Sequence, residues 1–541
     1  MSPLIVVLPV VVPLVTAALL LLFGERYKRT ASLVNVLSTI VGLAVAVTIL
    51  LRVDGDGAAG TMAVYLASNW EAPFGIVLVA DRLSALMLVL VGVVSVCASL
   101  YAEGAWARAG VYFHPLFQVQ LMGLNGAFLT GDLFNLFVFF EVMLAASYGL
   151  QLHGSGEARV RSGVHYIAVN LIASSLFLVG LAVLYGVTGT LTMADLAAKV
   201  ALVPVGDRGL LYAGAAILAV AFLIKAAIWP LNAWLVPAYM ATSAPVAALF
   251  ALMTKVGIYA LLRLWTMIFS SYTGPSAGFG GSLLLYGGLA TLAFAAIGLF
   301  ASTRIGRIAA FSIMVSSGTL LASIAFGSPA VTSAALFYMC SATLAVSALF
   351  LLVELLGRIG DDAQPPMPDV DVGYGEDTNL DDEQIPLVGR ILPGSIAMLG
   401  LTFMATAVLV AGLPPLSGFI AKLGLLTAVT GGEEGVSAAG WVFFALLLLA
   451  GLASVVSLSR AGIHLIWTPR DSAANVRAVE GFAVVTLIAV CAGLTVGAEP
   501  VMRYARATAD SLHAPYAYIE TVLSARARPR HGAAAAPEGT P

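Results

Sequence analysis

The sequence predicts an all-α polytopic membrane protein with about fourteen transmembrane helices, including two inverted five-helix repeats that each contain a proline-broken helix. The first observation is composition: the 541 residues are 60% hydrophobic and 10% charged, with a mean hydropathy of +0.98. Soluble domains carry roughly 25% charged residues, so most of this surface cannot face water. The second is that apolar runs of about 20 residues recur along the chain. The third is that two of these runs carry similar prolines near their middle.

Charge and cysteine content exclude several classes of protein. The formal net charge of -3 provides no basic field for nucleic acid. Cys97, Cys340 and Cys491 are scattered and form no C-x-x-C pair, so neither a zinc site nor a disulfide framework is implied. The first apolar run follows Met1 without a basic segment. We therefore expect it to be a retained helix and not a cleaved signal peptide.

The predicted helices divide the chain into repeats. Apolar runs start near Leu4, Ser32, Ala80, Phe113, Leu133, Val164, Leu210, Ala244, Ser282, Arg304, Val331, Pro393, Gly440 and Phe482. We assign them to N-terminal helices 1–3 (1–110), a first repeat of helices 4–8 (111–270), a second repeat of helices 9–13 (281–357 and 391–466) and helix 14 (478–500). Lys and Arg gather in alternate loops, which makes those loops cytoplasmic and places both termini outside.

Two segments have the composition of soluble chain. Residues 358–390 form an acidic cytoplasmic loop, with nine acidic residues between Asp361 and Glu383. A solvated linker accounts for this composition more simply than a partner-docking segment does. Residues 501–541 are expected to be a C-terminal tail that is partly disordered.

Prolines interrupt the seventh and twelfth predicted helices. Pro230 lies in one, and Pro414 and Pro415 lie in the other, each followed by a similar Pro-Leu-(Asn/Ser)-(Ala/Gly)-(Trp/Phe) pattern. Proline removes a backbone donor and breaks a helix. The two breaks are five helices apart, and a repeat with an odd number of helices inverts its orientation. Paired interrupted helices of this kind mark an ion path near the bilayer midplane; two incidental kinks are the alternative.

Four ionisable residues lie inside the predicted spans: Glu141, Lys225, Lys255 and Lys422. Each costs at least about 2.5–3.5 kcal/mol at a bilayer centre, so a functional role is the default interpretation. Burial disfavours the charged form of such groups and pairing favours it, so a Glu–Lys pair that forms and breaks can take up and release protons. The alternative is a static ion pair that sets helix register. One glutamate cannot pair three lysines, which favours a hydrated proton relay. Arg263, near a helix end, is expected to be an interface anchor.

Three sequence blocks resemble the antiporter-like membrane subunits shared by Mrp antiporters and respiratory complex I. They are GDLFNLFVFFEVML at 131–144, KAAIWPLNAWL with TKVGIYALLR between Lys225 and Arg263, and GLPPLSGFIAK at 412–422. Within this superfamily, details are similar to the D subunits of Mrp-type sodium/proton antiporters. Complex I subunits usually have proline shortly after the helix-5 glutamate and histidine two residues after the helix-7 proline. This chain has Ala145-Ala146 and Asn232 there, and it lacks the long extension of the largest Mrp subunit.

The resemblance implies a role for each buried charge. Glu141 and Lys225 match the family's functional pair, Lys255 its central relay lysine and Lys422 its exit-side lysine. Many relatives have histidine or lysine in helix 11, where this chain has none. A path between Lys255 and Lys422 must then use water with Ser341 and Thr343.

These observations predict a proton-translocating subunit of a multi-subunit sodium (monovalent cation)/proton antiporter: a secondary transporter, not an enzyme, in the plasma membrane of a prokaryote. Its expected partners are the other subunits of an Mrp-type complex, the bilayer, and the transported protons and sodium. No cofactor is expected, and metal binding is left open. One alternative is a proton-pumping subunit of a complex I-like or membrane-bound hydrogenase complex. Another is a non-conducting scaffold, which would not need buried charges.

Overall fold

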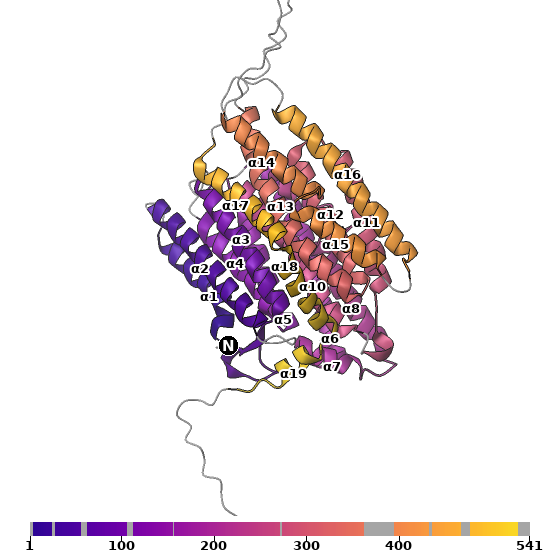
Figure 1. The fold of residues 1–541 in the computed structure, drawn as a ribbon. Coiled ribbons are helices and arrows are strands. Elements are labelled where there is room, and N and C mark those ends of the chain that lie inside the picture. The colour runs from indigo at the N-terminus through magenta and orange to yellow at the C-terminus, as the bar shows by residue number, and fades with distance from the viewer. Residues whose placement is uncertain are drawn as a thin grey trace, which may run out of the picture.

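A computed structural model describes residues 4–527 apart from the gaps 24–26, 56–61, 105, 107–111, 155, 271–272, 362–393, 432–434 and 467–475. Most of the predicted acidic loop and the end of the predicted tail therefore lie outside the described residues. The described chain is mostly helical (Figure 1). Its helices are α1 (Leu4–Leu22), α2 (Lys28–Asp54), α3 (Arg82–Gly104), α4 (Phe113–Leu129), α5 (Leu133–Leu152), α6 (Glu157–Thr188), α7 (Met193–Val200), α8 (Arg208–Lys225), α9 (Leu235–Ala241), α10 (Ala244–Ile268), α11 (Gly281–Phe300), α12 (Ile305–Ala325), α13 (Pro329–Asp361), α14 (Gly394–Ala411), α15 (Ser417–Thr430), α16 (Ala438–Ile466), α17 (Ala478–Val496), α18 (Ala498–His513) and α19 (Tyr516–Leu523).

The predicted fold class is confirmed. Among the described residues, 13 helices are long and apolar enough to cross a membrane. Helix α4, which has 17 residues, adds a further apolar helix at the predicted position. Each of the predicted apolar runs contains one of these helices, because a bilayer-spanning segment must satisfy its backbone hydrogen bonds internally.

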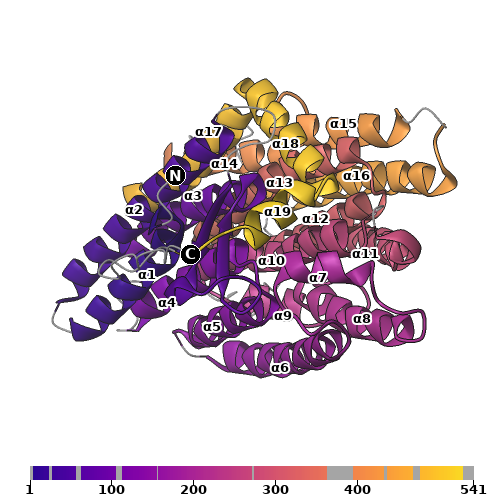
Figure 2. The same ribbon diagram turned by 90° about the horizontal axis from the view of Figure 1, so that it is seen from below.

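Helices α10, α12 and α13 form the centre of the bundle. The most apolar 18 residues of α10 are 100% buried, whereas those of α2 are 22% buried. Figures 1 and 2 show α10 and α13 in the middle, with α1 and α2 at one edge and α15 and α16 at another. Side chains on α10 therefore sit where lipid cannot reach them.

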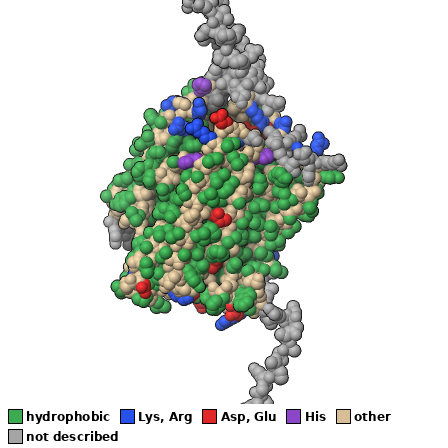
Figure 3. All heavy atoms as spheres, turned by 180° about the vertical axis from the view of Figure 1, so that it is seen from behind, with side chains coloured by type: hydrophobic (Ala, Val, Ile, Leu, Met, Phe, Trp, Pro, Cys, Tyr) green, Lys and Arg blue, Asp and Glu red, His purple; other side chains and the backbone are tan. Residues whose placement is uncertain are grey.

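The two ends of the bundle differ in charge. Figure 3 shows Lys and Arg side chains gathered at the upper end, above a broad band of hydrophobic side chains. We call this the inner end, following the positive-inside rule. Helix α12 begins there, next to Arg304 and Arg307. The chain's first described residues lie at the opposite, outer end (Figure 1).

Both proline-containing breaks are present. Helix α8 ends at Lys225 and α9 begins at Leu235, so Pro230 falls between them. Helix α14 ends at Ala411 and α15 begins at Ser417, with both prolines in the gap. The two interruptions place backbone carbonyls and amides, freed from helical pairing, inside the membrane region.

Two features of the outer end were not predicted. A hairpin pairs β1 (Ala63–Leu66) antiparallel to β2 (Val77–Ala80), with Ala63 opposite Ala80. In addition, much of the expected tail is folded, because α18 and α19 extend the helical chain to Leu523. The Tyr504 hydroxyl of α18 donates to the Arg82 carbonyl at 2.8 Å, which attaches this helix to the start of α3.

Candidate functional site

The four predicted charges differ in exposure. Lys225 is 4% and Lys255 is 2% exposed, so both lie within the bundle. Glu141 on α5 and Lys422 on α15 are partly exposed on its flanks. The charges thus extend from the α5 side through the centre to the α15 side, and these two helices lie on different sides of the molecule in Figure 2.

Glu141 and Lys225 lie near each other without direct contact. Lys225 contacts Phe140, the residue that precedes Glu141, but the described residues include no ion pair between Lys225 and Glu141. The Ser174 hydroxyl of α6 donates a hydrogen bond to Glu141 Oε1. The Lys225 ammonium instead lies 4.9 Å from the centre of the Phe140 ring, a cation–π contact. This arrangement resembles the separated form of a Glu–Lys pair.

The first helix break shapes the surroundings of Lys225. This lysine is the last residue of α8, where the helix dipole favours a positive charge. The Trp234 indole donates a hydrogen bond to the Ile224 carbonyl at 3.1 Å. A side chain from beyond the break therefore pairs one of the backbone carbonyls left free at the end of α8. The Trp229 amide bonds the Thr291 hydroxyl of α11 at 2.9 Å, which anchors the unwound segment.

Lys255 occupies the centre of α10. Its amine is buried and has no hydrogen-bond partner within the part of the chain that the structure describes. Two residues further on, a Cβ on Gly257 would lie 2.8 Å from the Phe222 carbonyl oxygen and 3.0 Å from the Ala226 amide nitrogen. Only glycine permits this approach, which packs the Lys255 segment against the end of α8 that carries Lys225.

Lys422 is held by the second helix break. Its ammonium donates to the Ala411 carbonyl, the last of α14, at 2.6 Å. Gly412 has a φ of 76°, and a Cβ there would lie 2.6 Å from Lys422 Cδ. The broken helix therefore supplies both an acceptor for the lysine and the space that the side chain occupies.

A small cavity is lined in part by Lys422. Its other walls are mostly apolar but include hydroxyl-bearing side chains from α12, α13 and α16: Ser312, Tyr338, Ser341 and Ser454. Its volume, counted for the centre of a water-sized sphere, is about 20 Å³, which is room for about one water molecule. The Ser341 hydroxyl lies 2.9 Å from that of Ser417. The sequence analysis did not single out Ser312, Tyr338 or Ser454, because hydroxyl groups in apolar helices are common and form no distinctive pattern.

Thr343, the second residue expected to assist a water path, lies differently from Ser341. Its hydroxyl donates to the Met339 carbonyl of its own helix at 2.6 Å. It is not among the residues that line the cavity. Of the two predicted residues, only Ser341 lines the cavity.

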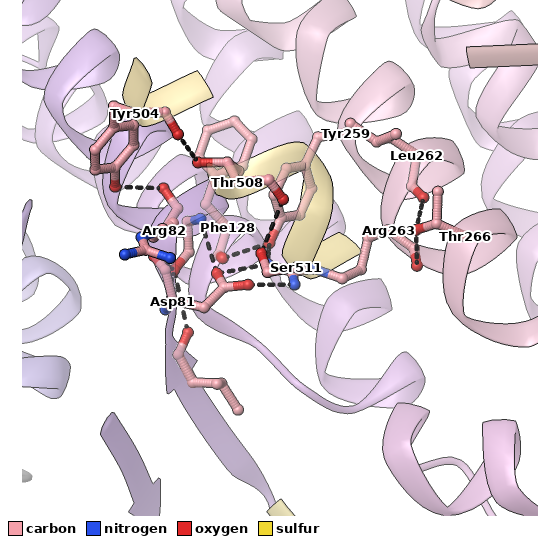
Figure 4. A network of polar contacts seen from close by, with 12 residues as sticks. Asp81, Arg82, Phe128, Tyr259, Leu262, Arg263, Thr266, Tyr504, Thr508 and Ser511 are labelled. Carbon is pink, nitrogen blue, oxygen red and sulfur yellow. Dashed lines mark hydrogen bonds and ion pairs between the residues drawn. The ribbon is translucent and has the colours of Figure 1, made fainter. Parts of the chain in front are cut away.

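An ion pair closes the outer end of α10 (Figure 4). The Arg263 guanidinium donates to both Asp81 oxygens, at 2.5 and 2.7 Å. It also contacts the Tyr259 hydroxyl, which donates to the Phe128 carbonyl at 2.7 Å. Arg263 is 4% exposed, so the expectation of an interface anchor is wrong. Lys255, Tyr259 and Arg263 are four residues apart and share one face of α10.

A second cluster joins helices at the inner end. Arg358 of α13 bonds Glu480 of α17 at 2.7 Å and Glu354 of its own helix at 2.8 Å. Glu354 also accepts from the Trp106 indole at 2.8 Å and from the Ala244 amide, at the start of α10, at 3.1 Å. The i, i+4 spacing of Glu354 and Arg358 was the sequence signal for part of this cluster.

The described residues offer no ready metal centre. No group of three or more His, Cys, Asp or Glu side chains in this part of the chain could hold a metal ion. Asp132, near the outer end, caps α5 by accepting from the Asn135 amide at 2.8 Å. The site is therefore a set of separated charges and hydroxyls, which suits proton transfer through water better than tight cation binding.

Similarity to known proteins extends over almost the whole chain. Residues 130–452 match the family described as "NADH:quinone oxidoreductase/Mrp antiporter, TM". The chain is 47% identical over 533 residues to the D subunit of a probable K(+)/H(+) antiporter of Rhizobium meliloti strain 1021, covering 97% of this chain and 98% of the relative. It is 34% identical over 529 residues to the D subunit of an Na(+)/H(+) antiporter of Alkalihalophilus pseudofirmus, covering 96% and 99%. A chain of the Mrp complex from Dietzia sp. DQ12-45-1b superposes with a TM-score of 0.79 at 27% identity, covering 97% of this chain and 100% of that one.

Proposed function

This chain belongs to the NADH:quinone oxidoreductase/Mrp antiporter family of membrane proteins, and we propose that it carries the protons of a multi-subunit monovalent cation/proton antiporter. The observation that carries the proposal is the pair of buried lysines, Lys225 and Lys255, whose amines have no hydrogen-bond partner among the described residues. A lysine held this way exchanges its proton more readily than one in an ion pair. The antiporter names of near-full-length relatives support the same function.

The proposed mechanism is a relay across the bundle. Glu141 approaches Lys225 and stabilises its charged form; when the two separate, Lys225 releases its proton toward Lys255. From Lys255 the proton crosses by water to the cavity that holds Ser341 and Tyr338, and then to Lys422. The membrane potential contributes about 2.3 kcal/mol per charge per 100 mV, enough to bias such exchanges.

The alternatives explain less. A redox-complex subunit would fit the fold, but the relatives that match this chain over almost its whole length are named as antiporter subunits. A scaffold would not need lysines inside the bundle, because each one costs free energy. We therefore assign a transporter subunit and not an enzyme.

Which cation is exchanged for protons must be determined by experiment, because one relative is named for K(+) and others for Na(+). The test is proton movement in vesicles from an antiporter-deficient strain that carries all subunits of the complex. Adding NaCl or KCl should dissipate the imposed pH gradient. In Lys422→Ala the rate of this dissipation should fall to less than about a tenth of the wild-type rate. A complex that assembles and exchanges cations normally with Lys422→Ala would contradict the proposed relay.

A further inference from the structure

A groove opens at the inner end between α9 and the α11–α12 turn. Its volume is about 720 Å³, and its walls include Asn232, Met240, Phe294, Arg304 and Arg307. The groove combines a basic rim with apolar walls. None of the residues assigned to the proton relay line it.

The rim carries positive charge that no carboxylate of the described residues pairs. Arg304 and Arg307 are exposed, and neither forms an ion pair within the described part of the chain. Two other inner arginines are occupied: Arg358 by two glutamates, and Arg159 by the carbonyls of His153 and Ala241. Both rim residues also lie at the start of the 21-residue helix α12, whose dipole adds positive potential.

The walls become apolar with depth. Phe311 is seven residues beyond Arg304 on α12, which is about 10 Å along the helix axis. The Arg307 guanidinium lies 5.7 Å from the centre of the Phe311 ring, and Phe311 as a whole is 5% exposed. Met240 on α9 and Phe294 on α11 are 38% and 39% exposed. A molecule filling this groove would meet cations at the membrane surface and hydrocarbon below it.

We propose that the groove binds one anionic phospholipid, with its phosphate between Arg304 and Arg307 and its acyl chains against Met240 and Phe294. A basic pocket between helices on the cytoplasmic side is suited to lipid headgroups. Free phosphate would contact only the arginines and leave the apolar walls uncovered. An acidic peptide bound to the arginines would likewise not need the apolar surface below them. The lipid would also contact α9, the second half of the first broken helix, and so restrain the segment that follows Lys225.

The test is lipid retention by the purified complex, measured by native mass spectrometry during titration with phosphatidylglycerol or phosphatidylcholine. The double variant R304Q/R307Q should bind phosphatidylglycerol about 30-fold more weakly, at about 1 kcal/mol for each arginine near the surface. The matched control is R161Q, another exposed inner arginine on α6, which should change binding little. Met240→Trp, which enlarges a side chain on the apolar wall and keeps both arginines, should also weaken binding.

Four results would overturn the proposal. One is equal phosphatidylglycerol binding by wild type and R304Q/R307Q. Another is equal retention of phosphatidylcholine, since that lipid carries no net negative charge. The third is displacement of the lipid by inorganic phosphate, which would indicate a simple anion site. Unchanged binding by Met240→Trp alone would likewise exclude acyl chains from the groove.

Discussion

The three lysines of the proposed relay are stabilised to different extents by their surroundings. Lys422 bonds a backbone carbonyl, and Lys225 faces an aromatic ring. Lys255 has no hydrogen-bond partner among the described residues. A charged amine costs free energy in a bilayer unless something solvates it. The charge on Lys255 should therefore be the easiest of the three to discharge, as a central relay group requires.

Substitutions of Lys255 separate a proton carrier from a fixed charge. Lys255→Ala should abolish antiport, and Lys255→Arg should fail nearly as completely, because arginine does not release its proton at physiological pH. Antiport in vesicles with a verified complex is the measurement. The control is Lys199→Ala, which removes a partly exposed lysine paired with Asp195. Wild-type antiport in Lys255→Arg would identify Lys255 as a fixed charge.

Glu141 offers a complementary test on α5. Glu141→Gln keeps the hydrogen bond from Ser174 but removes the charge that acts on Lys225. Antiport should fall by at least about tenfold, whereas Glu141→Asp should retain part of it. Glu157→Gln, at an exposed glutamate on α6, is the matched control. Normal antiport by Glu141→Gln would contradict the proposal that Glu141 controls the protonation of Lys225.

At the scale of elements, the two broken helices have different roles. The break after α8 ends the helix at Lys225 and is anchored by Trp229 and Trp234. The break after α14 supplies the carbonyl that receives Lys422. Each interruption provides backbone polar groups that an intact helix would have used internally. The breaks are thus where the fold can solvate a charge inside the membrane.

Glycine at the second break can be tested directly. Gly412→Ala places a Cβ 2.6 Å from Lys422 Cδ, so the lysine must move away from the Ala411 carbonyl and antiport should fall several-fold. Gly435→Ala is the matched control, because Gly435 also has a positive φ of 83° but nothing within 4 Å of its Cβ position. Backbone strain is then common to both variants. Equal loss in the two would refute the steric argument.

At the scale of the whole molecule, ion pairs connect distant parts of the chain at both ends of the bundle. Asp81 and Arg263 are separated by 182 residues, and Arg358 and Glu480 by 122. The first pair includes Arg263 of α10, and Glu354, which also bonds Arg358, accepts from the Ala244 amide at the other end of α10. These contacts hold both ends of the central helix, and Lys255 between them has no hydrogen-bond partner among the described residues.

Breaking the Asp81–Arg263 pair should destabilise the fold. Arg263→Gln leaves a buried carboxylate unpaired, which costs about 3–5 kcal/mol. Asp81→Asn/Arg263→Gln removes both charges and should recover part of this loss. Thermal unfolding of the purified complex is the measurement. Arg526→Gln, in the exposed pair with Glu71, should have little effect; a double variant no better than Arg263→Gln would argue against a charge-pairing role.

The cation should bind tightly elsewhere in the complex. A hard cation takes about six oxygen ligands, whereas Asp81, Glu354 and Glu480 are each occupied by an arginine. Isotope retention should therefore show no saturable sodium or potassium binding to this chain reconstituted alone, and binding to the whole complex. Saturable binding to the folded single chain that disappears in Glu141→Gln would contradict this expectation.

The sequence alone determined the membrane fold, both helix breaks and the four charges inside the spans. These are local properties: a span is recognised by length and hydropathy, and a proline or lysine within it is visible by itself. Helices α18 and α19 were not predicted, because α18 is too polar and α19 too short to resemble a span.

Only the tertiary structure decided which charges meet. Asp81 and Arg263 carry no pairing signal in the sequence, and their contact depends on how the segment before α3 packs on α10. The cavity at Lys422 likewise gathers hydroxyls from three helices. Whether a buried lysine is neutralised by a carboxylate or left beside water depends on side-chain distances of a few ångströms. Packing sets those distances, and they cannot be inferred from the hydropathy of the sequence.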